Sequence, residues 1–444
     1  MKMTRRRTVL TAAAGSAATI TAGCNLTGSS AGPKPSASAL PAELVWMPWS
    51  GANAAQAPTF ERVITAFTEK YPSTKLTLLV TTEQKAIKLK ALQAAGTPPD
   101  IADVHHNGGV RDMGPGGQVM DLAALLRRDP YPKTHAGWEP YAWQKKQYGV
   151  PWSLQSTALF YNKALFDQAG VQHPTERWTW DDYLDAAKRL VKPGADDAST
   201  IWGAGDQGGR NFQWMSAFLA SFGGTVLKPD YSECTITSAA SIEAMEFRAS
   251  LGARHRVTPN QPVGAAGMFG NGNYAMVTSG TFFVANVKES ASSRLNSSGV
   301  GWDVAPVPRG KARRAGLNHE LGIGIPTGVK NPDASWLGVR YLTGPDGIKP
   351  FVTIGRLIPP DRTMWKDALP TDGKPASFKK AFLDFWDEIN IEPPFVPRWP
   401  DVELAWQEEL DKVWTGDRPA REGAAGFKTR MDQHLKELKG SGLL

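Results

Sequence analysis

Five aromatic residues stand where a folded chain has little core to fill, at the ends of predicted strands, near a predicted helix start or in proline-flanked loops. They are Trp49, Trp152, Trp214, Phe282 and Trp399. Polar side chains lie in or beside the same segments, namely Ser50, Asn107, Gln155, Asn211, Gln213, Glu320 and, in a predicted turn, Arg356. Flat rings beside hydrogen-bonding groups suit a ligand with an apolar face and a rim of hydroxyls. The pattern therefore indicates a carbohydrate-binding site.

An enzyme is the main alternative at this point. A secreted glycoside hydrolase also uses tryptophan platforms, but it needs two carboxylates that face each other across a cleft. The chain has 43 acidic residues, so its composition leaves such a pair open. Neither a His-Glu-x-x-His motif nor a P-loop occurs in the sequence. We expect binding without catalysis, and no cofactor.

A metal or cationic ligand is a minor alternative, with His105 and His106 as ligands. Adjacent side chains of an extended segment point to opposite sides, so both rings cannot easily reach one ion. The chain has only two cysteines, which excludes a disulfide scaffold and a thiolate-built metal site. We therefore expect no metal.

The N-terminal 24 residues are typical of an export signal that ends in a lipidated cysteine. Lys2 and Arg5–Arg7 are followed by the uncharged stretch 9–22 and then by Cys24. The Arg-Arg pair resembles a twin-arginine signal, and Ala-Gly-Cys resembles a bacterial lipobox, although Thr21 stands where leucine is usual. We expect an acylated Cys24 to anchor the protein to the outer face of the cell membrane. Cleavage near residue 22 without a lipid is the alternative.

Removal of this signal also changes the charge of the protein. Residues 1–23 contain four basic and no acidic residues, so the net charge falls from +7 to +3. The only basic cluster, Arg309–Arg314, carries no interleaved aromatics, and we expect a solvated loop there. Nucleic acid is therefore not an expected partner. Residues 25–41 are small, polar and interrupted by proline, which predicts a flexible tether.

The folded body begins with an alternation of strands and helices. Apolar runs predict strands over 43–49, 75–80 and 99–104, and helical spacing predicts helices that begin at Pro58 and at residue 85. This order is typical of a parallel sheet with covering helices. Ligands bind at the carboxyl ends of such strands, so the loops that begin at Trp49 and His105 should share one edge.

The later chain contains two extended runs, 148–161 and 316–326, and the first is too long for one compact strand. Asn162 and Thr179 are placed to cap helices, a further helix is predicted over 214–222, and a strand over 273–279. The spacing of Trp46, Trp180, Trp336 and Trp406 follows strand or helix period and predicts core positions. No internal repeat is present.

Several segments resemble one known family in their order along the chain. They are Phe-Thr-Glu-Lys-Tyr-Pro (67–72), Ala-Gly-Thr-Pro-Pro-Asp-Ile (95–101), Tyr-Gly-Val-Pro (148–151), Leu-Phe-Tyr-Asn-Lys-Ala-Leu-Phe-Asp-Gln-Ala-Gly (159–170), Trp-Thr-Trp-Asp-Asp-Tyr (178–183), Phe-Gly-Asn-Gly-Asn-Tyr-Ala-Met-Val-Thr-Ser-Gly (269–280) and Ile-Pro-Thr-Gly-Val-Lys-Asn-Pro-Asp-Ala-Ser-Trp (325–336). The chain is similar to the family 1 extracellular solute-binding proteins, of the maltose-binding type, which are the substrate-capturing lipoproteins of bacterial sugar ABC importers.

The resemblance implies a two-lobed α/β fold of the periplasmic binding-protein type, with a hinge and a ligand cleft between the lobes. Lobe one would comprise 42–152 plus 316–360, and lobe two 156–312 plus 362–440. Phe282 would fall where the family often places a sugar-stacking aromatic, and Gln155 and the loop 105–107 where it commonly binds hydroxyls. The acids of maltose-type members are replaced here by amides at Gln155 and Asn107. The partners implied are a sugar or oligosaccharide and the permease subunits, with the protein itself a monomer.

Overall fold

The structure is a computed structural model of the chain. It describes residues 43–48, 57–81, 85–105, 109–206, 210–259, 265–289, 295, 301–318, 321–370, 372 and 375–444. These include two main sheets, one of five strands and one of four. Among the described residues, no helix is both long enough and apolar enough to cross a membrane.

The first sheet has the strand order β2-β1-β3-β12-β6. Its strands are β1 (Glu43–Met47), β2 (Lys75–Leu78), β3 (Ile101–His105), β6 (Val150–Ser153) and β12 (Leu321–Gly324). β1 pairs in parallel with both β2 and β3, which confirms the predicted parallel arrangement for these three strands. β12 pairs antiparallel with β3 and with β6, so the complete sheet is mixed.

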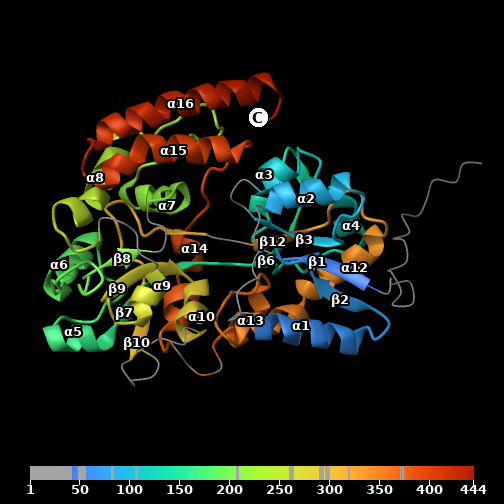
Figure 1. The fold of residues 1–444 in the computed structure, drawn as a ribbon, viewed down its shortest axis with the longest axis horizontal. Helices are drawn as coiled ribbons and strands as arrows, with labels where there is room; N and C mark the ends of the chain where they lie inside the picture. The colour runs from blue at the N-terminus through green and yellow to red at the C-terminus, as the bar shows by residue number, and fades with distance from the viewer. Residues whose placement is uncertain are drawn as a thin grey trace, which may run out of the picture. The chain divides into compact units, whose positions relative to one another are not determined.

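Helices cover both faces of the first sheet. They are α1 (Ala57–Lys70), α2 (Lys85–Ala94), α3 (Gly109–Met113), α4 (Ala123–Arg128), α12 (Pro332–Leu342) and α13 (Pro345–Val352), with the short hairpin β4 (Ala142–Trp143) and β5 (Lys146–Gln147). Figure 1 shows α1 and α13 lying side by side. Phe60, Val63 and Phe67 recur at helical spacing in α1 and are buried against Trp46 and Tyr341, as the apolar period predicts.

The second sheet has the strand order β10-β7-β9-β8. Its strands are β7 (Thr157–Asn162), β8 (Gly205–Asp206), β9 (Met276–Gly280) and β10 (Trp302–Pro306), and β11 (Gly316–Leu317) pairs separately with β13 (Asn390–Ile391). The helices are α5 (Lys163–Ala169), α6 (Trp180–Leu190), α7 (Phe212–Phe222), α8 (Ala239–Ala253), α9 (Ala265–Gly270), α10 (Phe282–Glu289), α14 (Trp386–Ile389), α15 (Trp399–Trp414) and α16 (Ala420–Gly440). α15 and α16 lie side by side (Figure 1).

Local sequence signals explain where several helices begin. Asn162 caps α5 by accepting a hydrogen bond from the backbone N–H of Leu165. At α6, the side chains of Thr179 and Asp182 each accept from the other's backbone N–H, which completes the predicted capping box although aspartate replaces the usual glutamate. Gly170, which ends α5, has a φ of 60°, a conformation that glycine adopts without strain.

We refer to the first sheet with its helices as the first lobe, and to the second sheet with its helices as the second lobe. The run 148–161 divides between them, because β6 belongs to the first sheet and β7 to the second. The run 316–326 also divides: β12 belongs to the first sheet, whereas β11 pairs with β13 and packs against α7 and β7 of the second lobe. Residues 316–317 therefore lie with the second lobe, and the return to the first lobe begins after them rather than at residue 316.

Two predictions about single side chains have different outcomes. Trp46, Trp180, Trp336 and Trp406 are all buried, which confirms their predicted core positions. The expectation of a solvated loop at 309–314 is wrong for Arg314, which is buried and donates to the backbone oxygens of Val307 and Glu176. The reason is that its guanidinium group lies inside the loop, where these two backbone oxygens accept its hydrogen bonds.

The first lobe contains a buried histidine with a strongly shifted titration. His135 is 5% exposed, and a ring nitrogen lies 3.1 Å from the backbone oxygen of Pro151. Burial lowers the pKa of His135 from about 6.5 to about 4. Below about pH 6.5, His135 therefore binds a proton in the unfolded chain but not in the folded protein. The free energy of unfolding falls as the pH drops towards 4.

We predict that His135→Gln, which keeps a donor for Pro151 but cannot be protonated, reduces this acid sensitivity. The loss of unfolding free energy between pH 7 and pH 4.5 should be smaller than in the wild type by up to about 3 kcal/mol. Urea denaturation at the two pH values measures the difference. An identical loss in both proteins would show that His135 is not the responsible group.

Candidate functional site

Four strand ends meet at one edge of the first sheet. β1 and β3 are parallel, so their carboxyl ends lie on the same side. Leu321, the first residue of β12, pairs with His105 at the end of β3 and with Ser153 at the end of β6. Ligands of open α/β sheets bind at such an edge. The predicted site residues Trp49, Ser50, Asn107 and Glu320 lie outside the described residues, but each is within three residues in sequence of one of these ends.

Strand ends of the second sheet also meet at one edge. Thr157 at the start of β7 pairs with Gly280 at the end of β9, and Ala158 pairs with Pro306 at the end of β10. Only residues 154–156 separate this edge from the end of β6 at Ser153. Four Cα steps span at most about 14 Å, so both edges border the same narrow region. We take this region as the candidate site.

Gln155 occupies the middle of this crossing segment and is almost completely buried. Its amide nitrogen donates to Ser153 Oγ at 2.8 Å and to the backbone oxygen of Arg356 at 3.3 Å, and its amide oxygen accepts from the backbone N–H of Phe282 at 3.0 Å. The side chain thereby ties the crossing segment to the start of α10. In this conformation its amide groups bind the protein itself, and its direct effect is to position Phe282.

Phe282 is half-buried at the first position of α10. Thr281, just before it, is held by a hydrogen bond from its backbone N–H to the backbone oxygen of Ser156. A Cβ atom on Gly280 would lie 2.7 Å from the ring of Phe282, so glycine at position 280 permits the observed ring position. The ring is thus fixed beside the crossing segment, and its role in stacking stays a prediction.

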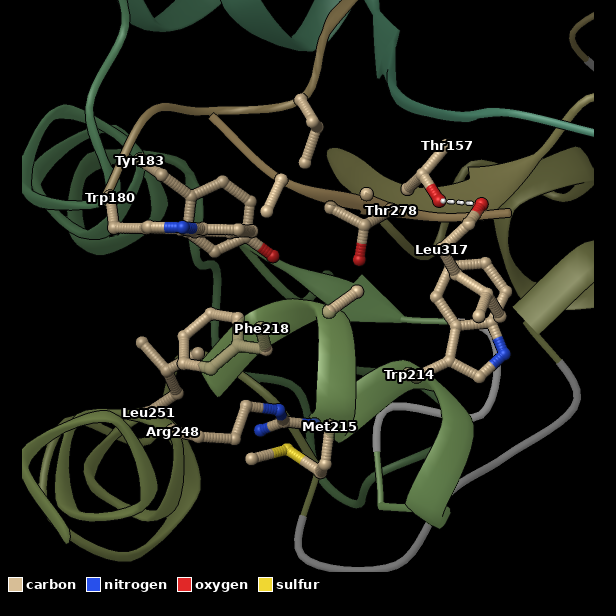
Figure 2. Close-up of a pocket in the computed structure, with 14 residues that line it drawn as sticks. Thr157, Trp180, Tyr183, Trp214, Met215, Phe218, Arg248, Leu251, Thr278 and Leu317 are labelled. Atoms are coloured by element: carbon tan, nitrogen blue, oxygen red, sulfur yellow. Dashed lines mark hydrogen bonds between the residues drawn. The ribbon is translucent and has the colours of Figure 1, made fainter. Parts of the chain in front are cut away.

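Trp214 lies in the first turn of α7 and is also half-buried. Asn211 caps this helix by accepting from the backbone N–H of Trp214, and Trp214 lines a cavity of about 40 Å³. Figure 2 shows the cavity between α7 and strand residues Thr157 and Thr278, with the Thr157 hydroxyl donating to the backbone oxygen of Leu317 at 3.2 Å. Such a volume holds only a few water molecules. The cavity alone is therefore too small to hold a sugar ring.

Sequence reasoning did not identify Thr157, Thr278 or Leu317 as site residues. A signal exists for the two threonines, because they occupy the strand face that carries Leu159 and Met276 further along and is otherwise apolar. A polar residue that interrupts such a face near a strand end often borders a polar site. Leu317 shows no comparable signal, since its position depends on the pairing of β11 with β13.

The remaining predicted residues take up different positions. Trp152 lies in the core of the first lobe and is only 3% exposed. Its ring is in edge contact with Trp46 and Phe351. Its indole N–H donates to the backbone oxygen of Leu342 at 3.0 Å. This position leaves almost none of its ring surface for a ligand. Trp399 is buried at the start of α15 against Phe212 and Phe395.

Gln213 is buried in α7 and Arg356 is half-buried. Arg356 offers its backbone oxygen to Gln155. Of the predicted residues, the structure therefore brings Gln155, Phe282 and Arg356 together at the crossing, and Asn211 and Trp214 together at the start of α7. Among the described residues no group of three His, Cys, Asp or Glu side chains is arranged to hold a metal ion.

Comparison with known proteins gives a consistent result. The sequence profile of the bacterial extracellular solute-binding proteins matches residues 51–349. The arabinooligosaccharide-binding protein of Halalkalibacterium halodurans is 25% identical over 154 residues, which is 34% of each chain. The erythritol/L-threitol-binding protein of Mycolicibacterium smegmatis is 22% identical over 62% of this chain and 58% of its own length. The matched part thus spans between a third and three fifths of these two relatives.

Solved structures share the whole architecture. An ABC substrate-binding protein of Listeria monocytogenes, in complex with cycloalternan, has a TM-score of 0.75 at 21% identity and covers 90% of this chain and 99% of its own. The GacH receptor of Streptomyces glaucescens, solved unliganded and with acarbose, has a TM-score of 0.74 at 21% identity and covers 89% and 98%. At this identity the likeness shows the fold, which is the two-lobed α/β fold of periplasmic binding proteins.

We predict that Gln155→Leu lowers the free energy of unfolding by about 1–3 kcal/mol, because it leaves buried partners without hydrogen bonds. Gln155→Glu should also destabilise the protein, because a carboxylate oxygen would replace the donor that faces Ser153 and Arg356. Denaturant unfolding at pH 7 measures both effects. Gln172→Leu, at an exposed position of the second lobe, is the control and should change stability by less than about 0.5 kcal/mol. Equal values for the Gln155 and Gln172 variants would contradict the positioning role.

Proposed function

Because the chain belongs to the bacterial extracellular solute-binding proteins, we propose that it captures a sugar or oligosaccharide between its two lobes and delivers it unaltered to the permease of an ABC importer. The observation that carries the proposal is the placement of two half-buried aromatic residues: the backbone of Phe282 binds Gln155 of the crossing segment, and Trp214 lines a cavity together with Thr157, which directly follows that segment. The proposal also includes Trp49, Ser50, Asn107 and Glu320, which lie outside the described residues and adjoin in sequence the strand ends of the first sheet.

The chemistry of the described residues supports a neutral, hydroxyl-rich ligand. A sugar ring has an apolar C–H face that packs on an aromatic ring, and hydroxyls that both donate and accept hydrogen bonds. Thr157 and Thr278 contribute hydroxyl groups to the wall of the cavity beside Trp214. The proteins compared above are named for, or were solved with, arabinooligosaccharide, erythritol or L-threitol, cycloalternan and acarbose. All of these ligands carry several hydroxyls.

Capture of this kind requires that the sugar bind the closed arrangement of the lobes better than the open one. The difference between the two affinities sets how far the population shifts towards closure. The crossing segment 154–156 passes from one lobe to the other, and residues 357–359 lie beside it. They are bridged by two backbone hydrogen bonds between Leu154 and Ile358, of 2.9 and 3.1 Å.

Export and anchoring form a further part of the proposal. The basic segment Lys2–Arg7, the uncharged stretch that follows and Cys24 support a signal peptide that ends in a lipidated cysteine. Several acyl chains on one residue meet the requirement that stable anchoring takes more than one chain. A tether over 25–41 would then hold the folded body near the permease.

We predict saturable sugar binding that depends on the two aromatic residues. Intrinsic tryptophan fluorescence should be followed against arabinotriose, maltotriose, mannobiose, acarbose and erythritol. For the sugar that binds most tightly, Phe282→Ala and Trp214→Ala should each raise Kd at least tenfold, which corresponds to about 1.4 kcal/mol. Trp178→Ala, which removes a half-buried indole that packs against Phe166 of α5, should leave Kd within about twofold.

Two results would contradict this proposal. The first is unchanged affinity in both Phe282→Ala and Trp214→Ala, which would remove the site. The second is the appearance of shorter products when an oligosaccharide is incubated with the purified protein, which would indicate a glycoside hydrolase. Product analysis by chromatography should therefore accompany the titrations.

We predict that Cys24→Ala converts a membrane-associated protein into a soluble, exported one, because the acyl chains can no longer be attached. Fractionation of cells that express the two proteins, followed by detergent extraction of the membrane fraction, measures the change. An unaltered distribution would show that Cys24 carries no anchor.

A further inference from the structure

The two lobes also contact each other through α3, a short helix of the first lobe. α3 begins four residues after His105, which ends β3 at the edge that carries the candidate site. Two adjacent residues of α3, Arg111 and Asp112, reach residues of the second lobe. We call these interactions the α3 contact.

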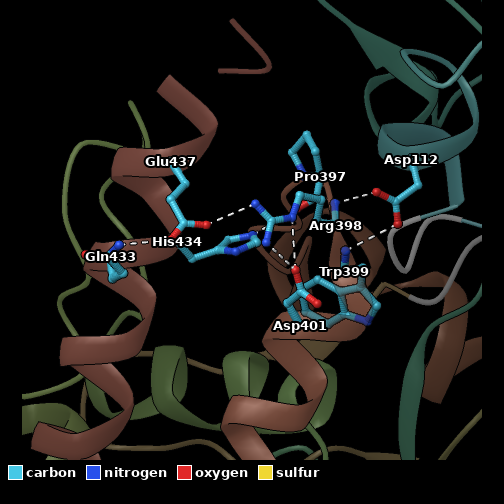
Figure 3. A network of polar contacts seen from close by, with 8 residues as sticks. All are labelled: Asp112, Pro397, Arg398, Trp399, Asp401, Gln433, His434 and Glu437. Atoms are coloured by element: carbon cyan, nitrogen blue, oxygen red, sulfur yellow. Dashed lines mark hydrogen bonds and ion pairs between the residues drawn. The ribbon is translucent and has the colours of Figure 1, made fainter. Parts of the chain in front are cut away.

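Asp112 caps a helix of the other lobe. Its carboxylate accepts hydrogen bonds from the backbone N–H groups of Arg398 and, at 3.2 Å, Trp399, where the 16-residue helix α15 begins (Figure 3). The first N–H groups of a helix have no partner within the helix, and a carboxylate is favoured at this positive end. α15 has no side-chain cap from its own N-cap residue, Arg398. The first lobe therefore supplies the cap that the second lobe lacks.

The segment that receives Asp112 is held in place within the second lobe. Arg398 has a φ of 58°, a conformation that is costly for a residue other than glycine. Figure 3 shows its guanidinium group between Asp401 of α15 and Glu437 of α16, at 2.7 and 3.0 Å. His434 of α16 binds the backbone oxygen of Pro397 at 3.0 Å. These contacts fix the two N–H groups in the direction from which Asp112 approaches.

Arg111 makes the second half of the contact. It is 6% exposed, and its guanidinium group donates to the hydroxyl of Tyr231 at 2.7 Å and to the backbone oxygen of Phe395 at 2.6 Å. The group also lies over the ring of Trp143, 4.4 Å from its centre, with Glu392 at 3.8 Å. Trp143 belongs to the first lobe and the other three partners to the second, so separation of the lobes would break most of these interactions.

The surroundings of the α3 contact indicate that it is easily broken. A cavity of about 350 Å³ adjoins it, lined by Arg111, Glu139, Tyr231 and Glu392 among others. Water can enter such a polar space and replace the hydrogen bonds of the contact. Burial raises the pKa of the Asp112 carboxyl although the two N–H groups lower it, so the desolvation of the carboxylate offsets much of what the hydrogen bonds contribute.

We propose that the α3 contact forms when the lobes close and sets the sugar affinity, although Arg111 and Asp112 do not themselves contact the sugar. The proposal rests on capture by closure as described above. The free energy of the contact adds to the closed state alone, so its loss lowers the closed fraction and raises the apparent Kd. Because a broken contact releases the sugar faster without slowing its arrival, the dissociation rate should carry most of the effect.

The test compares Asp112→Asn, Asp112→Ala and Arg111→Met with Asp185→Asn. For the panel sugar that binds the wild type most tightly, each of the first three variants should raise Kd by about three- to thirtyfold, the range of a lost helix cap. Stopped-flow fluorescence should show faster dissociation, and the melting temperature of the sugar-free protein should stay within about 1 °C of the wild type. Asp185→Asn, which removes the exposed carboxylate partner of Lys188 inside the second lobe, should leave Kd within about twofold.

The outcomes separate the two proposals. Wild-type binding together with an unchanged Kd in all three variants overturns the role of the α3 contact and leaves sugar capture intact. A lower Kd in Asp112→Ala also overturns this role, because the contact would then belong to the open state. A large fall in the melting temperature of the sugar-free variants overturns it as well, because it would indicate a purely structural role. Failure of the wild type to bind any panel sugar overturns both proposals.

Discussion

The division of two extended runs between two sheets is the constraint on which the rest of the structure depends. β6 ends at Ser153 and β7 begins at Thr157, so three residues join a strand of one sheet to a strand of the other. The edges at which the strands of the two sheets begin or end are thereby brought to one region. Gln155 then connects this region to the start of α10 through the backbone of Phe282, and to the segment that follows α13 through the backbone of Arg356. A ligand bound there can contact elements of both lobes at once.

Much of this arrangement could be predicted from local sequence signals. The apolar spacing of α1, the capping box of α6 and the aperiodic run 148–161 each depend on neighbouring residues, and the structure confirms all three. Trp336 and Trp406 are buried as their helical spacing predicts. Such signals work because the period of a helix or strand and the satisfaction of its terminal N–H groups are local properties.

The features that escaped prediction depend on residues far apart in the chain. Trp152 lies at the end of a strand, but α13 supplies Phe351 about 200 residues later and covers its ring. Leu317 joins the second lobe through β13, more than 70 residues away. Asp112 and Arg398 are separated by 286 positions, and nothing in the sequence of α3 identifies its carboxylate as the cap of α15. Burial and capping of this kind follow from how the lobes are assembled, which local patterns do not encode.

The energetics of closure explain why contacts between the lobes should be weak. A sugar can shift the balance between open and closed states only by the difference in its affinity for the two. If polar contacts between the lobes were strongly favourable, the closed state would dominate without a sugar, and the binding site would be shut before a ligand could enter. Asp112 combines hydrogen bonds to two backbone N–H groups with the desolvation of its own charge, and the adjoining cavity admits water as a competing partner. Contacts of this kind can stabilise the closed state without making it the dominant state of the sugar-free protein.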